Sequence, residues 1–114
     1  MLRILLATIM LIASVLATQA HSPLKNSNPA HKSQVSAPLE MVALTFGKKA
    51  RLTKLTVTNS DNVSTEIDLS DNKEFNLEHS INISVLSSGN YTLSWRALSD
   101  DGHPIRGAIE FTVK

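Results

Sequence analysis

Apolar and polar residues alternate along most of this chain. A period of two runs through six segments: 39–46, 51–58, 65–69, 75–85, 90–98 and 108–113. The clearest segment places on one face Phe75, Leu77, His79, Ile81, Ile83 and Val85. Such alternation, rich in β-branched and aromatic residues, predicts half-buried strands. In segment 51–58, Leu52 is out of phase with Leu55 and Val57.

Turn-forming residues separate these segments, at 47–49, 59–62, 70–73, 87–90 and 100–104. None of the segments after residue 20 has the period of 3.6 that a helix requires. We therefore predict an all-β domain of about seven short strands, a Greek-key β-sandwich or barrel of the immunoglobulin-like or cupredoxin-like kind. Tyr91 follows Gly89 at the start of a segment, a pattern typical of a tyrosine corner, in which the hydroxyl bonds back to the backbone.

The first 20 residues have a different character. One cation in residues 1–3 precedes an almost unbroken apolar stretch, 4–17, and the small or polar residues 18–20. This order predicts a signal peptide that is cleaved after Ala20. A membrane anchor is disfavoured, because a spanning helix needs about 20 apolar residues. The mature domain is then 21–114, exported and free of the membrane after processing.

Removal of the signal peptide changes the charge balance. The 114-residue chain has eleven Lys and Arg against ten Asp and Glu, and the loss of Arg3 equalises them. A neutral domain is a poor match for nucleic acid or an anionic membrane, both of which need a basic surface. The chain has no cysteine, which excludes disulfides, thiolate metal sites and cysteine nucleophiles. After cleavage, Met41 is the only methionine left.

Two features carry metal-binding chemistry. Cleavage after Ala20 would make His21 the first residue, so that its α-amine and imidazole could chelate one ion; alternatively, it is a residue tolerated after the cleavage site. In an extended segment Asp101 and His103 point to the same side, although Asp and Gly are also common in turns. Together these groups form a nitrogen and oxygen donor set without sulfur, which favours Cu(II) in a tetragonal plane. Zn(II) in a tetrahedral arrangement remains an alternative.

The C-terminal part resembles the signature of the CopC family of exported copper-binding proteins. The residues that carry the resemblance are Leu86, Gly89, Tyr91, Leu93, Trp95-Arg96-Ala97, Ser99, Asp101, His103-Pro104, Gly107, Phe111 and Val113-Lys114. The N-terminal part is similar in His21, Asn28-Pro29-Ala30, Ala37-Pro38 and Leu44-Thr45-Phe46. The resemblance implies a seven-stranded Greek-key barrel in the periplasm. It implies one Cu(II) per chain, with His21, Asp101 and His103 as ligands, and a CopD-type inner-membrane transporter as partner.

The chain departs from the family at two places. Lys48 stands where members usually have Glu, which puts a cation near the expected Cu(II) site. The mid-chain methionines that form a Cu(I) site in some members are missing, so we expect no Cu(I) site. We expect His79 to be a buried, hydrogen-bonded core residue. We expect His31 to lie on the surface, with weak auxiliary metal binding as an alternative.

These observations favour a copper carrier or buffer without catalysis. They do not distinguish a role in copper uptake from a role in copper resistance. One alternative is a small copper redox enzyme of the histidine-brace type, but Asp101 would fill a position that oxygen activation needs open. The other is a metal-free interaction module. The basic cluster Lys48, Lys49, Arg51 and Lys54 is expected to be a solvated hairpin edge, with docking to a membrane partner as the alternative.

Overall fold

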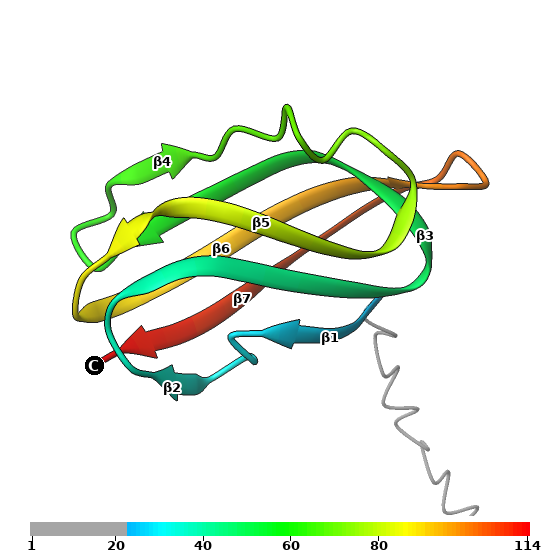
Figure 1. Ribbon diagram of the computed structural model, residues 1–114. Coiled ribbons are helices and arrows are strands. Elements are labelled where there is room, and N and C mark those ends of the chain that lie inside the picture. Colours follow the sequence, from blue (N-terminus) through cyan, green and yellow to red (C-terminus); the bar gives the residue numbers. More distant parts are fainter. Residues whose placement is uncertain (1–22) are drawn as a thin grey trace, which may run out of the picture.

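The computed structural model describes residues 23–114, which form seven strands (Figure 1). The strands are β1 (Leu24–Asn28), β2 (Ser33–Val35), β3 (Leu39–Asn59), β4 (Ser64–Glu66), β5 (Asn76–Leu86), β6 (Gly89–Ser99) and β7 (Pro104–Val113). Within residues 23–114, no helix has the length and apolar character needed to cross a membrane. The predicted signal peptide and His21 lie outside the described residues.

Strand β3 organises the fold because it takes part in both layers. Its first half pairs with β1 and β5, and its second half pairs with β4 and β6. Strand β7 then pairs with β6, and β2 adds to β7 in parallel. Figure 1 shows β3 crossing the molecule, turning at one end and returning in the other layer. The predicted all-β, seven-stranded sandwich is confirmed.

The predicted turn at 47–49 is wrong, because strand β3 continues through it. Residues 47–50, here called the β3 bend, carry the strand from one layer to the other. Ala50 pairs with Asn76 of β5 and with Ser99 of β6. The basic cluster Lys48, Lys49, Arg51 and Lys54 therefore lies on and just after a bend within one strand, and not on a hairpin edge. Two predicted strands thus merge into one, whereas β1 and β2 were not predicted and β4 is shorter than expected.

A β-bulge explains the phase shift of Leu52. Leu52 pairs with Ala97 and Lys54 pairs with Arg96, so Thr53 is the extra residue. A bulge inserts one residue and restores the alternation on its far side. Leu52 and Leu55 are both buried as a result, and Lys54 points away from the core.

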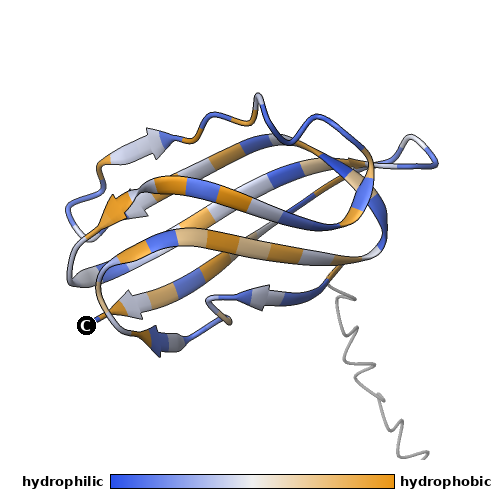
Figure 2. Ribbon diagram, viewed as in Figure 1, coloured by the Kyte–Doolittle hydropathy of each residue, from blue (hydrophilic) through white to orange (hydrophobic). Residues whose placement is uncertain are grey.

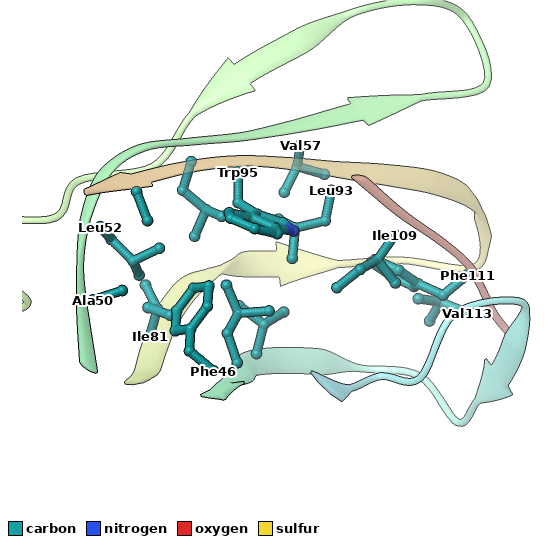
Figure 3. Close-up of a cluster of buried hydrophobic side chains, with 14 residues drawn as sticks. Phe46, Ala50, Leu52, Val57, Ile81, Leu93, Trp95, Ile109, Phe111 and Val113 are labelled. Carbon is teal, nitrogen blue, oxygen red and sulfur yellow. The ribbon is translucent and has the colours of Figure 1, made fainter. Parts of the chain in front are cut away.

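The core lies between the two layers and centres on Trp95 (Figure 3). Phe46 from β3 meets the Trp95 ring edge-on, with ring centroids 5.2 Å apart. Gly107 is the partner of Trp95 on β7, and a Cβ there would come within 2.7 Å of the indole. Figure 2 shows the alternating hydropathy of the strands, as expected for layers with one buried face.

Strand β5 follows its predicted alternation only in the middle. His79 and Ile81 are buried, whereas Phe75, Leu77 and Val85 near the strand ends are exposed. Alternation records which face a side chain occupies, and burial also requires a covering layer, which these ends lack. The tyrosine corner is confirmed, since the Tyr91 hydroxyl donates to the Ser87 carbonyl at 2.8 Å.

Candidate metal centre

The hairpin between β6 and β7 holds both predicted ligands in the described part of the chain. The Gly102 amide donates to the Ser99 carbonyl at 2.9 Å, and the Ser99 amide donates to the His103 carbonyl at 2.9 Å. This pattern is a tight turn followed by a residue in the left-handed region, which is common in three-residue hairpin loops. Gly102 occupies that position with φ of 88°, a conformation that disfavours side chains. The glycine therefore shapes the loop that brings Asp101 to His103.

Asp101 and His103 contact each other directly. His103 Nδ1 and Asp101 Oδ2 are 3.0 Å apart, and the His103 amide donates to Asp101 Oδ1 at 3.3 Å. The two side chains are 78% and 46% exposed for His103 and Asp101, so both reach solvent. When Nδ1 carries the proton and donates it to the carboxylate, Nε2 keeps a free lone pair. The two side chains meet as predicted, but they meet across a tight loop and not along an extended segment.

Ser99, which the sequence analysis named only as part of the family signature, is also a site residue. Its hydroxyl donates to Asp101 Oδ1 and accepts the His103 amide proton at 3.2 Å. These bonds to Ser99, and then those to His103, lower the pKa of the Asp101 carboxyl to about 2. Hydrogen bonds to the charged form favour that form, so Asp101 is an anion at neutral pH. The available signal was the spacing Ser-x-Asp-x-His, which puts all three residues on one side of an extended chain.

The hairpin borders a pocket of about 330 Å³. Its lining residues are Pro23, Gly47, Lys48, Ser99, Asp101, His103 and Ile105. Two backbone bonds join its walls: the Gly47 amide donates to the Pro23 carbonyl at 3.2 Å, and the Asp100 amide donates to the Lys49 carbonyl at 2.9 Å. The start of the described chain, the β3 bend and the β6–β7 hairpin therefore meet at one place. Lys48 lies in this wall. This agrees with the expectation that it is near the predicted ligands.

Within residues 23–114, Asp101 and His103 have no third His, Asp or Glu close enough to complete a metal cluster. The remaining predicted ligand, His21, lies outside the described residues. Pro23, two residues after His21, lines the pocket. The described part of the chain thus supplies two donors and a pocket wall that includes Pro23.

His79 is a core residue, as predicted. It is 2% exposed, its Nε2 lies 2.7 Å from the Ala50 carbonyl, and its ring meets Phe46 edge-on at 5.7 Å. A ring nitrogen bonded to a buried carbonyl carries the proton and has no lone pair to offer a metal. His79 therefore supports the β3 bend from the inside.

His31 is exposed, as predicted, and it has a structural partner that the sequence analysis missed. Its Nδ1 accepts the Glu110 amide proton at 3.1 Å, and the neighbouring Lys32 amide donates to the Glu110 carbonyl at 2.6 Å. These bonds tie the turn between β1 and β2 to strand β7. His31 is not among the residues that line the pocket at Asp101 and His103.

Curated relatives match the chain over most of its length. Copper resistance protein C of Escherichia coli is 33% identical over 111 residues, covering 86% of this chain and 85% of the relative. Copper resistance protein C of Pseudomonas syringae pv. tomato is 30% identical over 112 residues, covering 91% and 88%. Protein YobA of Escherichia coli K12 is 28% identical over 100 residues, covering 83% and 80%.

Solved structures and a family model agree with these relatives. CopC from Methylosinus trichosporium OB3b superimposes with a TM-score of 0.65 at 29% identity, covering 82% of this chain and 94% of that one. PcoC, a methionine-rich copper resistance protein from Escherichia coli, gives a TM-score of 0.57 at 33% identity, covering 83% and 100%. The CopC domain model matches residues 24–114. The family model and these relatives together show that the chain belongs to the CopC family.

Proposed function

We propose that this protein is a copper resistance protein of the periplasm, which holds one Cu(II) ion at the β6–β7 hairpin and buffers it or carries it to a CopD-type membrane transporter. The observation that carries the proposal is the pairing of Asp101 with His103 in a pocket that Pro23 also lines. The relatives are copper resistance proteins, which supports copper as the metal. The nitrogen and oxygen donors support the oxidation state Cu(II).

The Asp101–His103 pair has the spacing of two neighbouring metal ligands. Bonds of about 2.0–2.1 Å to nitrogen and oxygen, set at a right angle, place the two donors about 2.9 Å apart. His103 Nδ1 and Asp101 Oδ2 are 3.0 Å apart. An ion can therefore replace the proton between them with little movement of the hairpin. Asp101 is ionised at neutral pH, as an unperturbed aspartate also is, so no proton has to leave the carboxylate when a metal binds.

His21 completes the donor set in this proposal. Two residues span at most about 7 Å of extended chain. Because Pro23 lines the pocket, the chain is long enough for His21 to reach it. Cleavage after Ala20 creates an α-amine beside the imidazole of the same residue. The amine, two imidazoles and one carboxylate are four donors without sulfur, and Cu(II) has the highest affinity for such sets among the common divalent ions.

Lys48 adjusts the charge of the site. It lines the pocket at which the usual family residue would add a carboxylate. A nearby cation repels the metal and offsets the charge of Asp101, which lowers affinity and speeds release. We therefore expect Lys48→Glu, which changes the local charge by two units, to strengthen Cu(II) binding by at least about tenfold. Weaker holding at a single site suits a protein that transfers copper.

The α-amine is the part of this proposal that one experiment can isolate. We compare the processed protein, which starts at His21, with a variant carrying one alanine before His21, and titrate each with Cu(II) against a competing chelator. The matched control carries one alanine after Lys114, which lies at the opposite end of the molecule from the hairpin (Figure 1). The N-terminal extension should weaken binding more than about a hundredfold, because a first ligand costs more than the 10–100-fold of an outer contact. Equal affinities would show that the His21 amine is not a ligand.

A further inference from the structure

The outer face of the sheet formed by β3, β6 and β7 carries a straight row of three cations. Lys54 pairs with Arg96, and Arg96 pairs with Arg106, in the antiparallel register of the three strands. All three side chains are exposed and lie on the face away from the core. Paired residues on neighbouring strands are about 5 Å apart, so the row is about 10 Å long. The overall neutrality of the mature sequence hides this local concentration of positive charge.

No carboxylate in residues 23–114 neutralises the row. None of the three side chains forms an ion pair, and none has a hydrogen bond. On the same face, Glu66 lies opposite Thr56, diagonal to Lys54, without an ion pair. Glu110 lies four residues beyond Arg106, about 13 Å along the strand. Like charges directly opposite one another destabilise a sheet, so folding alone does not favour this arrangement.

The surface beside the row is a shallow, smooth hollow. It has a volume of about 550 Å³, and its lining includes Lys54, Thr56, Ser94, Arg96, Arg106 and Ala108. Apart from Trp95 and the three cations, the residues that line the hollow are small or carry hydroxyl groups, which lets another surface approach closely. By contrast, Arg51 has a partner, since its guanidinium lies 5.5 Å from the centre of the Phe75 ring.

We propose that the row Lys54, Arg96 and Arg106 is a docking surface for a protein partner that presents a row of carboxylates. Guanidinium groups bind carboxylates through two parallel hydrogen bonds, and two of the three cations are arginines. A linear row on an open sheet fits several carboxylates in line better than one small anion, which needs donors that converge. A lipid surface is a weaker match, because three cations give only weak attachment to an anionic membrane. The large exposed apolar residues also lie outside this hollow: Met41, Val63, Phe75, Leu77 and Val85.

The test uses metal-free processed protein and an oligo-glutamate peptide as probe, with oligo-glutamine as the neutral control. Binding is followed by amide chemical shifts at low and high salt. We expect shifts confined to the outer face of β3, β6 and β7, and their loss at high salt, where charges on the surface are screened. Replacement of the three cations by glutamine should weaken binding by about tenfold, the combined loss of three exposed ion pairs.

A matched variant separates the effect of the row from the effect of the protein's net charge. It replaces Lys25, Lys73 and Lys114, three exposed lysines outside the row, by glutamine and should bind like the unmodified protein. Equal weakening in both variants would overturn the proposal, as would unchanged binding in the row variant while its spectrum stays folded. Three other results would also overturn it: inorganic phosphate binding as tightly as the peptide, binding only to vesicles with phosphatidylglycerol, or shifts that reflect self-association in sedimentation.

Discussion

The β3 bend has a histidine on each side, and the two differ in almost every respect. His79 lies under the bend in the core, where its Nε2 bonds the Ala50 carbonyl. His103 lies over it, exposed to solvent, with Nδ1 against the Asp101 carboxylate. The first has a neutral partner and is buried; the second has a charged partner and is exposed to solvent. Whether an imidazole can hold an ion therefore depends on its partner and its exposure. Its presence on an apolar or polar stretch of the sequence is not enough to decide this.

The largest expected effect comes from removing the exposed histidine. His103→Ala takes away one proposed ligand, and Cu(II) affinity should fall by more than about a hundredfold, since even outer contacts of a metal site cost 10–100-fold. The unfolding midpoint of the metal-free protein should hardly change, because the side chain contacts solvent. Competition titration and urea unfolding measure the two effects. His31→Ala is the control, and an equal loss of affinity there would remove the distinction between surface histidines.

Removing the buried histidine should have the opposite effect. His79→Ala opens a cavity beside Phe46 and leaves the Ala50 carbonyl without its side-chain donor, so the free energy of unfolding should fall by about 2–3 kcal/mol. Cu(II) affinity of the folded fraction should stay within about threefold, a change of less than 1 kcal/mol. Unfolding curves and copper titrations below the transition test this. A large loss of copper affinity in a still folded protein would contradict the core role.

Ser99 allows a smaller test of the exposed side. Ser99→Ala removes the hydroxyl that bonds Asp101 Oδ1, so the carboxylate is held less firmly. We expect Cu(II) affinity to fall by about tenfold, at the low end of the range for outer contacts of a metal site. Ser94→Ala, on the outer face of the same strand, is the matched control. Identical affinities for both variants would mean that Ser99 does not position the ligand.

The smallest expected effect is a pH dependence from Asp101. Its pKa of about 2 lies below the value of about 3.9 for an unfolded aspartate. A lowered pKa stabilises the fold above pH 3.9, and this contribution is lost as the pH falls toward 2. The effect is small because the side chain is exposed. A carbon-detected titration should place the Asp101 midpoint near 2 and show it rising in Ser99→Ala. A midpoint near 3.9 in the unmodified protein would contradict the hydrogen-bonded arrangement.

The sequence predicted the layers well because alternation directly reports which face a strand buries. Trp95, Tyr91 and His79 all lie as that pattern indicated. It failed where burial depends on distant elements: Leu77 shares the face of His79 but lacks a covering layer. It also failed at the β3 bend, because Gly47 and two lysines form a turn in most contexts. Here, strands on both sides pair with Ala50 and keep the chain extended.

The site was predictable in part for similar reasons. Asp101 and His103 are two residues apart, so local geometry was enough to bring them together. Ser99 belongs to the same alternation, but a serine in a strand carries no chemical signal without its partners. Lys48 and Pro23 reach the pocket only through the pairing of β1 with β3 and the bonds of the bend. Contacts of that kind depend on register between distant segments, which period-two patterns do not specify.

Paramagnetic broadening by Cu(II) tests most directly whether the protein has a single copper site at Asp101 and His103. Less than one equivalent of Cu(II) is added to nitrogen-15-labelled protein that starts at His21, and the amide signals are followed residue by residue. We expect the amide signals of residues 47–48, 99–103 and 105 to disappear together while those around Tyr91 and Glu110 stay sharp, and we expect no further change when the titration is continued past one equivalent. Broadening centred on His31 or His79, or spread evenly over the chain, would contradict a single copper site at Asp101 and His103.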